Sequence, residues 1–553
     1  MNAPLSAHPI FILSDELTRA LAELMPVAAT YIGLPGHDHR WEDLSPAGHD
    51  QRAAVFSGFR RRLAALDAGT DPWLTLAKAT LADQLDQWLE AHEQRDHLLD
   101  LNSIDCPFQN MRMVFDVMDT STAAGWENVA ARLEGLGSAL AGYRALLAEG
   151  LAQGRAVARR QVEAVLEQAR VHAGDTSYFA TLPATAPEAI RARIDAGARS
   201  ARAGIAAFAD WLRQEYAPRA VARDAVGPER YARAAARHLG MKLDAREAYA
   251  WGWDEVRRLE AAMRQTARAI DAGAAVPALV QRLKHAPEGC ASGPAHFLEL
   301  MMERQQRAVE KLDGVHFAVP PPARRIEVKL APPGSVLGAY YTAPSEDFSR
   351  AGCVWYVLGE TQAPPLFTEI SVAYHEGFPG HHLQIATQMH LGEKLSRFQR
   401  VVAGNTGYAE GWALYAEQLM FELGYLERPE YELGMQLEQL VRAYRVVVDI
   451  GLHLELPVPA EAALGAAWTF ETMLEAMHAR SFLPRDHAES EVTRYMGWPA
   501  QAIAYKLGQR AILKLREERR RAQGSAFSLA GFHQAVLEVG SVGLDLLAER
   551  LRA

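Results

Sequence analysis

The densest group of metal-ligating side chains lies in residues 374–384, which read YHEGFPGHHLQ. Imidazole is the commonest zinc ligand, and a neighbouring glutamate can take a proton from a metal-activated water. His375, His381 and His382 therefore could supply ligands, with Glu376 as the base. A polar surface turn would also explain them, but apolar residues on both sides of the motif favour a buried site. The sequence predicts a metal centre here, and His and Glu ligands with an open position suit zinc best.

The spacing of these histidines does not fit a straight helix. His375 and His381 are six residues apart, about 120° around a helix, whereas His375 and His382 align but are separated by about 10 Å of rise. Neither pair could then share one ion. However, Pro379 has no backbone N–H, it disfavours helical angles at Phe378, and glycines stand on either side of these two residues. We expect the helix to break between the two histidines.

Two motifs together carry a family resemblance. Residues 375–384 and residues 408–417, which read YAEGWALYAE, resemble a bacterial family known as domain of unknown function 885. That family in turn is similar to zinc peptidases such as thimet oligopeptidase and angiotensin-converting enzyme. Those peptidases are mostly helical, with a deep cleft between two lobes. The resemblance implies a mainly α, two-lobed architecture and the cleavage of peptide bonds.

The peptidases carry the pattern His-Glu-x-Gly-His, followed by a glutamate ligand from a later helix. Matching the Gly-His pair to His381 leaves two extra residues in this chain. The resemblance then implies His375, His381 and Glu410 as ligands of one zinc ion per chain. It implies Glu376 as the general base.

The residues around Glu410 support this assignment only in part. Glu410 and Glu417 are seven apart and share one helix face beside an apolar stripe. Taken alone, a helix with surface salt bridges explains them equally well. Next to the histidine motif, we interpret Glu410 as a ligand and Glu417 as a residue that supports one.

A group of three residues near the carboxyl end of the chain could stabilise the oxyanion that forms when water attacks a carbonyl. Arg494, Tyr495 and Tyr505 are donors in one cluster, and donors aimed at developing charge usually make a large catalytic contribution. A single aromatic residue in a helix more often belongs to the core. Asp449 and His453 are four apart and could hydrogen-bond each other near the substrate or the metal, although a purely structural histidine is as good an explanation.

Short β-branched and aromatic runs separated by Pro and Gly precede the metal motif, at residues 326–328, 337–341 and 353–358. They predict a small antiparallel sheet. In the peptidases an edge strand pairs with the substrate, and residues 353–358 look similar; otherwise they form only a structural hairpin. Tyr340 and Tyr341 would then face the substrate, and Arg350 could bind a carboxylate.

Long amphipathic helices are predicted over most of the rest, as in residues 126–173, and again from Phe367 onward. The composition changes after Gly314. We therefore expect a helical amino-terminal lobe at residues 1–314 and a metal-site region at residues 315–553, interleaved as one catalytic unit.

Composition excludes several classes. The 553 residues are 49% hydrophobic and 23% charged, which is typical of a folded globular protein. A net charge of −10 disfavours nucleic acid as a partner. Three scattered cysteines do not suggest a disulfide framework, no segment has the apolar length of a membrane span, and the first 23 residues lack the layout of a secretory signal. We expect a cytoplasmic protein without a membrane partner.

The leading hypothesis is a zinc-dependent hydrolase of short peptides with Glu376 as general base. A non-peptide amide or an ester is an alternative substrate. A non-catalytic helical binding protein on the same scaffold is the alternative from another class. A serine hydrolase is poorly supported because the chain has no Gly-x-Ser-x-Gly motif.

Overall fold

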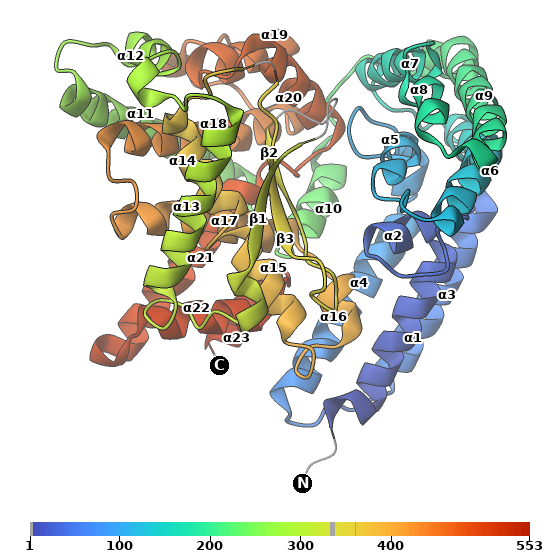
Figure 1. Cartoon of the computed structure of the whole chain (residues 1–553), viewed down its shortest axis with the longest axis horizontal. Helices are drawn as coiled ribbons and strands as arrows, with labels where there is room; N and C mark the ends of the chain where they lie inside the picture. The colour runs from blue at the N-terminus through green and yellow to red at the C-terminus, as the bar shows by residue number, and fades with distance from the viewer. Residues whose placement is uncertain (1–3, 332–337, 360, 553) are drawn as a thin grey trace. The chain divides into compact units, whose positions relative to one another are not determined.

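The computed structural model describes residues 4–331, 338–359 and 361–552 (Figure 1). The chain divides into two compact units. The first comprises residues 1–224, 396–402 and 496–498, and the second comprises residues 225–395, 403–495 and 499–553. The predicted division at residue 314 does not coincide with this boundary, because the helices after residue 224 pack with the carboxyl-terminal helices of the second unit.

The first unit is helical over its described residues. Its α-helices are α1 (Pro9–Leu24), α2 (Pro26–Tyr31), α3 (Pro46–Ala64), α4 (Pro72–Glu93), α5 (Pro107–Met113), α6 (Ala123–Ala152), α7 (Arg159–Ala173), α8 (Tyr178–Thr185), α9 (Glu188–Trp211) and α16 (Arg397–Val401). The core lies between α6 and α9, where Leu133, Leu140 and Tyr143 are buried. Gly204 of α9 lies so close to Gly137 of α6 that a side-chain carbon there would be 3.0 Å from its Cα. Small residues thus let these two helices pack tightly.

The second unit holds the remaining α-helices and the sheet. The helices are α10 (Pro228–Leu239), α11 (Ala245–Ile270), α12 (Val276–Leu283), α13 (Pro294–Leu312), α14 (Leu366–Glu376), α15 (His381–His390), α17 (Thr406–Glu422), α18 (Pro429–His453), α19 (Phe470–Glu475), α20 (Arg485–Gly497, of which the last two residues belong to the first unit), α21 (Ala504–Gln523), α22 (Leu529–Glu538) and α23 (Leu544–Arg552). Nearly all of α18 from Tyr431 onward is buried, and it packs on α11 and α14. The mainly α fold with one small sheet, predicted from the sequence, is confirmed.

Close helix contacts in this unit depend on glycine. A side-chain carbon on Gly411 of α17 would lie 2.4 Å from the backbone of Gly508 on α21. Another on Gly434 of α18 would lie 1.7 Å from the carbonyl oxygen of Phe367 on α14. These contacts fix α14, α17, α18 and α21 against one another, and these helices carry the candidate site.

The sheet has three strands in the order β1-β3-β2, with β1 at Ile326–Leu330, β2 at Ala339–Thr342 and β3 at Gly352–Tyr356. β2 pairs with β3 in antiparallel register, Ala339 opposite Tyr356, while β1 pairs with β3 in parallel register, Ile326 opposite Gly352. The prediction of a purely antiparallel sheet is therefore wrong. β1 and β2 run in opposite directions and β3 lies between them, so β3 is antiparallel to β2 and parallel to β1.

This order also corrects the predicted substrate strand. β3, which covers most of residues 353–358, has partners on both sides and offers no free edge for a peptide. The edge strands are β1 and β2, and Tyr341 of β2 bonds to His382 of the histidine motif. Leu337, the first residue of the predicted middle strand, lies outside the described residues.

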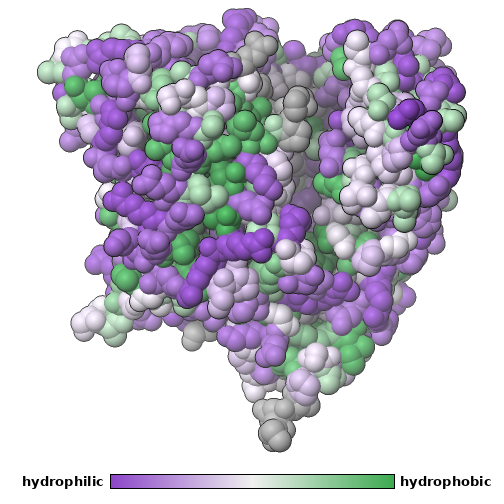
Figure 2. Space-filling view, in the orientation of Figure 1, coloured by the Kyte–Doolittle hydropathy of each residue, from purple (hydrophilic) through white to green (hydrophobic). Residues whose placement is uncertain are grey.

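No helix among the described residues is long and apolar enough to cross a membrane. Figure 2 shows hydrophilic residues over most of the visible face, with apolar residues in smaller groups between them.

Candidate metal centre

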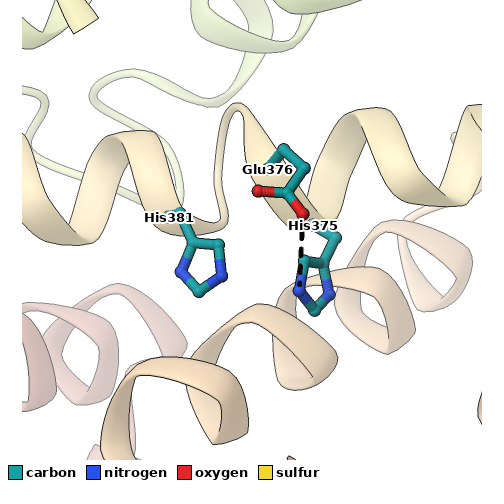
Figure 3. A group of neighbouring side chains, drawn as sticks. All are labelled: His375, Glu376 and His381. Carbon is teal, nitrogen blue, oxygen red and sulfur yellow. Dashed lines mark ion pairs between the residues drawn. The ribbon is translucent and has the colours of Figure 1, made fainter. Parts of the chain in front are cut away.

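The helix that carries the histidine motif breaks where the sequence predicts. α14 ends at Glu376, and α15 begins at His381 (Figure 3). The turn between them is tight: a side-chain carbon on Gly380 would lie 1.9 Å from the carbonyl oxygen of His375. Only glycine fits there. The turn brings both imidazoles to the same side of the chain, with ring centres 5.0 Å apart and planes perpendicular.

Two buried side chains hold this turn in place. Gln305 of α13 accepts a hydrogen bond from the Phe378 N–H at 2.6 Å and donates one to the Ala373 carbonyl at 2.7 Å. Trp412 of α17 donates from its indole to the Pro379 carbonyl at 2.9 Å. The backbone groups that the broken helix leaves unpaired are thus satisfied by neighbouring helices.

Glu410 of α17 completes the group. Its Oε2 atom lies 3.3 Å from His375 Nε2 and 3.5 Å from His381 Nε2. In a tetrahedral zinc site with bonds of roughly 2.0–2.1 Å, neighbouring ligand atoms are about 3.3 Å apart. Oε2 is buried and makes no hydrogen bond of acceptable geometry within the described part of the chain. Two imidazole nitrogens and an orphaned carboxylate oxygen therefore supply the donor set of a zinc site, and both nitrogen–oxygen distances are close to those between zinc ligands.

Glu376 stands beside these three atoms. Its Oε1 atom is 4.0 Å from His375 Nε2, and ligand-type atoms of His375, Glu376 and His381 lie within 4.8 Å of one another (Figure 3). Burial raises the pKa of Glu376 despite the two imidazoles nearby. A raised pKa moves a carboxylate toward the range in which it can both take and return a proton.

Glu417 holds His375 from the opposite ring nitrogen. Its Oε1 atom is 2.7 Å from His375 Nδ1, and Oε2 accepts from Ser371 at 2.9 Å and Gln439 at 3.2 Å. The side chain is 1% exposed. When the imidazole is neutral, this carboxylate fixes the tautomer in which Nδ1 carries the proton and the Nε2 lone pair is free for a metal ion.

The group is strongly coupled electrostatically. Burial alone would lower the pKa of His375, but the Glu410 and Glu417 carboxylates outweigh this effect and raise the pKa to about 10. Burial raises the pKa of Glu410, but His381 and His375 bring it well below its usual range. The cluster thus stabilises a positive charge between its carboxylates.

His382 is not placed to be a ligand. Its Nδ1 atom is 3.0 Å from the Tyr341 hydroxyl, and its Nε2 atom is 2.8 Å from the Ala323 carbonyl. With both nitrogens occupied and the pKa lowered by burial to about 4, it is a neutral imidazole that donates from Nε2. Of the two adjacent histidines, the geometry brings His381 to Glu410 and ties His382 to the sheet.

The chain matches one known family model over most of its length. A family model described as "Bacterial protein of unknown function (DUF885)" matches residues 26–551. The chain belongs to the DUF885 family. A search of curated protein sequences found no match to this DUF885 protein.

Two solved structures are similar to the DUF885 protein over nearly its whole length. One is a proposed lipoprotein from Colwellia psychrerythraea, with 23% identity, a TM-score of 0.87 and 98% of each chain covered. The other is a proposed lipoprotein of unknown function from Shewanella oneidensis, with 18% identity, a TM-score of 0.77, and 99% of this chain and 100% of that chain covered. At these identities the likeness shows a shared fold.

The two tyrosines predicted near the site differ in their surroundings. Tyr495 is fully buried, donates to Glu491 and accepts from Arg445 at 2.9 Å, and Arg494 binds the same glutamate. Tyr505 is partly exposed, and burial together with the Glu410 carboxylate raises its pKa. Of the two tyrosines, Tyr505 is thus the one whose pKa the Glu410 carboxylate raises, while Tyr495 and Arg494 belong to a buried network.

Asp449 and His453 do not bond to each other as predicted. The Oδ1 atom of Asp449 accepts from Tyr231 at 2.6 Å and from the Ala500 N–H at 3.1 Å. His453 accepts from the Val226 N–H at 3.4 Å and faces the Tyr495 carbonyl at 3.0 Å. Backbone groups occupy both imidazole nitrogens, so the structure favours the structural explanation for His453.

The remaining predicted residues lie on or near β2. Tyr340 stacks on Trp355, with ring centres 6.2 Å apart, on the face of the strand opposite Tyr341. Arg350 is exposed in the segment between β2 and β3. Burial raises the pKa of Tyr341, and the charge of Arg350 offsets part of this rise.

Sequence reasoning missed Gln439 and Arg442 of α18 and Gln305 of α13. Gln439 donates to Glu417 at 3.2 Å, and Arg442 shares its helix face three residues later. The spacing predicts a shared face but not the helix against which that face packs. Gln305 gave no signal, since it lies in an ordinary amphipathic helix far from the motif in sequence.

Proposed function

We propose that this DUF885 protein is a zinc-dependent hydrolase that cleaves peptide bonds in short peptides. The observation that carries the proposal is the convergence of His375 Nε2, His381 Nε2 and Glu410 Oε2 at 3.3 and 3.5 Å, with Glu376 beside them. His375, His381 and Glu410 would hold the ion. Glu417 would fix the ring of His375.

When bound, zinc would lower the pKa of a water molecule and polarise the scissile carbonyl. Glu376 would take a proton from the attacking water as the oxygen–carbon bond forms. The same carboxyl group would return that proton to the nitrogen as the carbon–nitrogen bond breaks, which releases an amine and a carboxylate. The Tyr505 hydroxyl would donate to the carbonyl oxygen as negative charge develops there.

The outer edge of β2 would bind the extended backbone of the substrate. Tyr341 connects this strand to His382, the residue next to the candidate ligand His381. An added strand would therefore run beside the metal site. Tyr340 and Arg350 would contact side chains or a carboxylate of the substrate.

A relationship to thimet oligopeptidase and angiotensin-converting enzyme is part of this proposal. It is supported by the His-Glu and downstream Glu pattern and by the mainly helical fold with a small sheet. The two residues by which the motif of this chain is longer than His-Glu-x-Gly-His fall in the turn that joins α14 to α15. A cytoplasmic location also stays a proposal, and the solved relatives described as proposed lipoproteins make cell fractionation its proper test.

Turnover of a peptide library by zinc-loaded protein tests the function. We expect cleavage products by mass spectrometry, and a loss of about 10²–10⁴-fold in kcat for Glu376→Gln. Glu422→Gln is the matched control, because Glu422 lies on the exposed end of α17 and pairs with Arg516. Equal turnover by wild type and Glu376→Gln would contradict the proposed mechanism.

The same assay separates the alternatives. Cleavage of esters or non-peptide amides, but of no peptide, would keep the metal site and change the substrate class. No turnover of any of these substrates by a fully zinc-loaded protein would favour a non-catalytic binding protein on this scaffold.

A further inference from the structure

A group of buried arginines borders the candidate metal centre and takes no part in the proposed chemistry. Arg442 and Arg445 lie on α18, and Arg494 lies on α20. Their side chains are 12%, 11% and 12% exposed. We call these three residues the arginine cluster.

The cluster has more positive charge than its direct partners neutralise. Glu438 pairs with Arg442. Glu491 Oε2 accepts from Arg445 Nη2 at 2.8 Å and from Arg494 Nη2 at 2.8 Å. Three guanidinium groups thus share two carboxylates. Glu410 and Glu417 also act on Arg442 through space without pairing with it, so unused hydrogen-bond donors, more than net charge, indicate room for an anion in this cluster.

Two guanidinium nitrogens identify where that anion would bind. Arg442 Nε and Arg445 Nη1 are buried and make no hydrogen bond within the described ranges of the chain. The other nitrogens of Arg445 are engaged by Tyr495 and Glu491, and its guanidinium carbon lies 4.7 Å from the ring centre of Tyr505. Arg445, which carries one of the two free donors, therefore lies against the residue that we place at the substrate carbonyl.

The register of α18 connects the cluster to the metal site. Gln439 donates to Glu417, the partner of His375, at 3.2 Å. Arg442 follows three residues later, about 4.5 Å further along the helix axis, and Arg445 lies one turn beyond it. Burial and the Arg445 charge lower the pKa of Arg442, and the Glu417 and Glu410 carboxylates partly offset this effect.

We propose that Arg442 and Arg445 bind the free terminal carboxylate of a peptide substrate, so that the protein acts at the carboxyl end of short peptides. Guanidinium groups match the planar geometry of a carboxylate and bind it with charge-assisted hydrogen bonds. The inference rests on the proposed peptidase function, and it names the substrate class that the function leaves open.

Binding, measured without turnover, tests this inference. The protein is the zinc-loaded full chain carrying Glu376→Gln, and the ligands are acetyl-trialanine with a free carboxylate and the same peptide as a terminal amide. By calorimetry we expect the amide to bind about 10- to 100-fold more weakly. Adding Arg442→Gln removes this preference, and Arg442→Lys, which keeps the charge, retains part of it.

Arg510→Gln is the matched control, because Arg510 on α21 pairs with Glu247 away from the cluster; it keeps the full preference. Thermal melts establish that each variant is folded, and Arg445→Gln provides a second removal of charge. Equal binding of acid and amide, no binding of either peptide, or a preference that survives both Gln substitutions would overturn the inference. Peptide cleavage by the protein with Glu376 intact would still support the proposed function, whereas a carboxylate preference without any cleavage would contradict only that function.

Discussion

Glu417→Gln tests whether the carboxylate behind His375 prepares it to bind metal. Glu417 accepts three hydrogen bonds, from His375 at Oε1 and from Ser371 and Gln439 at Oε2. Glutamine has the same shape but one acceptor oxygen. If its amide nitrogen faces His375 Nδ1, the ring must carry its proton on Nε2, and the lone pair that faces Glu410 is lost.

If the amide nitrogen instead faces Ser371 and Gln439, it meets two groups that donate hydrogen bonds to Glu417, whose side chain is 1% exposed. Loss of such a partner of a metal-ligating histidine typically weakens metal binding about 10- to 100-fold, or about 1.4–2.7 kcal/mol. We therefore expect this decrease in zinc affinity for Glu417→Gln in a competition titration with a coloured chelator. Glu422→Gln, on the exposed end of the same helix, keeps the wild-type affinity. A folded Glu417→Gln protein that binds zinc as tightly as the wild type would refute the reasoning.

Three further predictions follow from the same contacts. Tyr505→Phe lowers kcat about 10²- to 10³-fold without unfolding the protein. Tyr495→Phe removes the buried hydrogen bonds that its hydroxyl makes with Arg445 Nε and Glu491, so we expect a loss of about 1–3 kcal/mol of unfolding free energy. Steady-state kinetics and denaturant titrations check the pair, and the reverse pattern would be incompatible with these roles of the two hydroxyls. Burial raises the pKa of Asp449 to about 7, so the unfolded chain loses this proton first as pH rises. The free energy of unfolding therefore falls progressively from about pH 4 to pH 7. Asp449→Asn removes this part of the decline, and parallel curves of stability against pH for the two proteins would count against the prediction. Gly380→Ala forces a carbon to within 1.9 Å of the His375 carbonyl oxygen, so we expect a loss of about 1–3 kcal/mol in stability together with weaker zinc binding, and an alanine variant with native stability and affinity would mean that the turn is not needed in this form.

The break between α14 and α15 was predictable because its cause is local. Proline and glycine act within a few residues, and the mismatch between histidine spacing and helix geometry required a break. The mainly helical fold was predictable for a similar reason, since apolar periodicity marks helices along the chain.

The sheet and the pocket were less predictable because their determinants are distant in sequence. Residues 353–358 alone do not indicate that this strand has partners on both sides, because this depends on where β1 packs. Asp449 and His453 have helical spacing for a mutual hydrogen bond, yet partners from other segments, such as Tyr231 and Val226, take their polar atoms. Tertiary contacts thus override a local pattern.

The separation of Tyr505 from Tyr495 also required the packed structure. Both residues are aromatic donors in one cluster of sequence. Only the burial of Tyr495 against Glu491 and Arg445, and the effect of the Glu410 carboxylate on the pKa of Tyr505, distinguish them. The sequence could indicate the cluster but not the member that faces the site.

Metal content per chain, measured by plasma mass spectrometry on untagged protein after zinc incubation and dialysis, is the direct test of the metal site. We expect one zinc per chain in the wild type and in Glu422→Gln, and a loss of that zinc in Glu410→Ala, because Glu410 Oε2 lies against both imidazoles. A wild-type protein that holds no zinc, or a folded Glu410→Ala protein that holds as much zinc as the wild type, would contradict it.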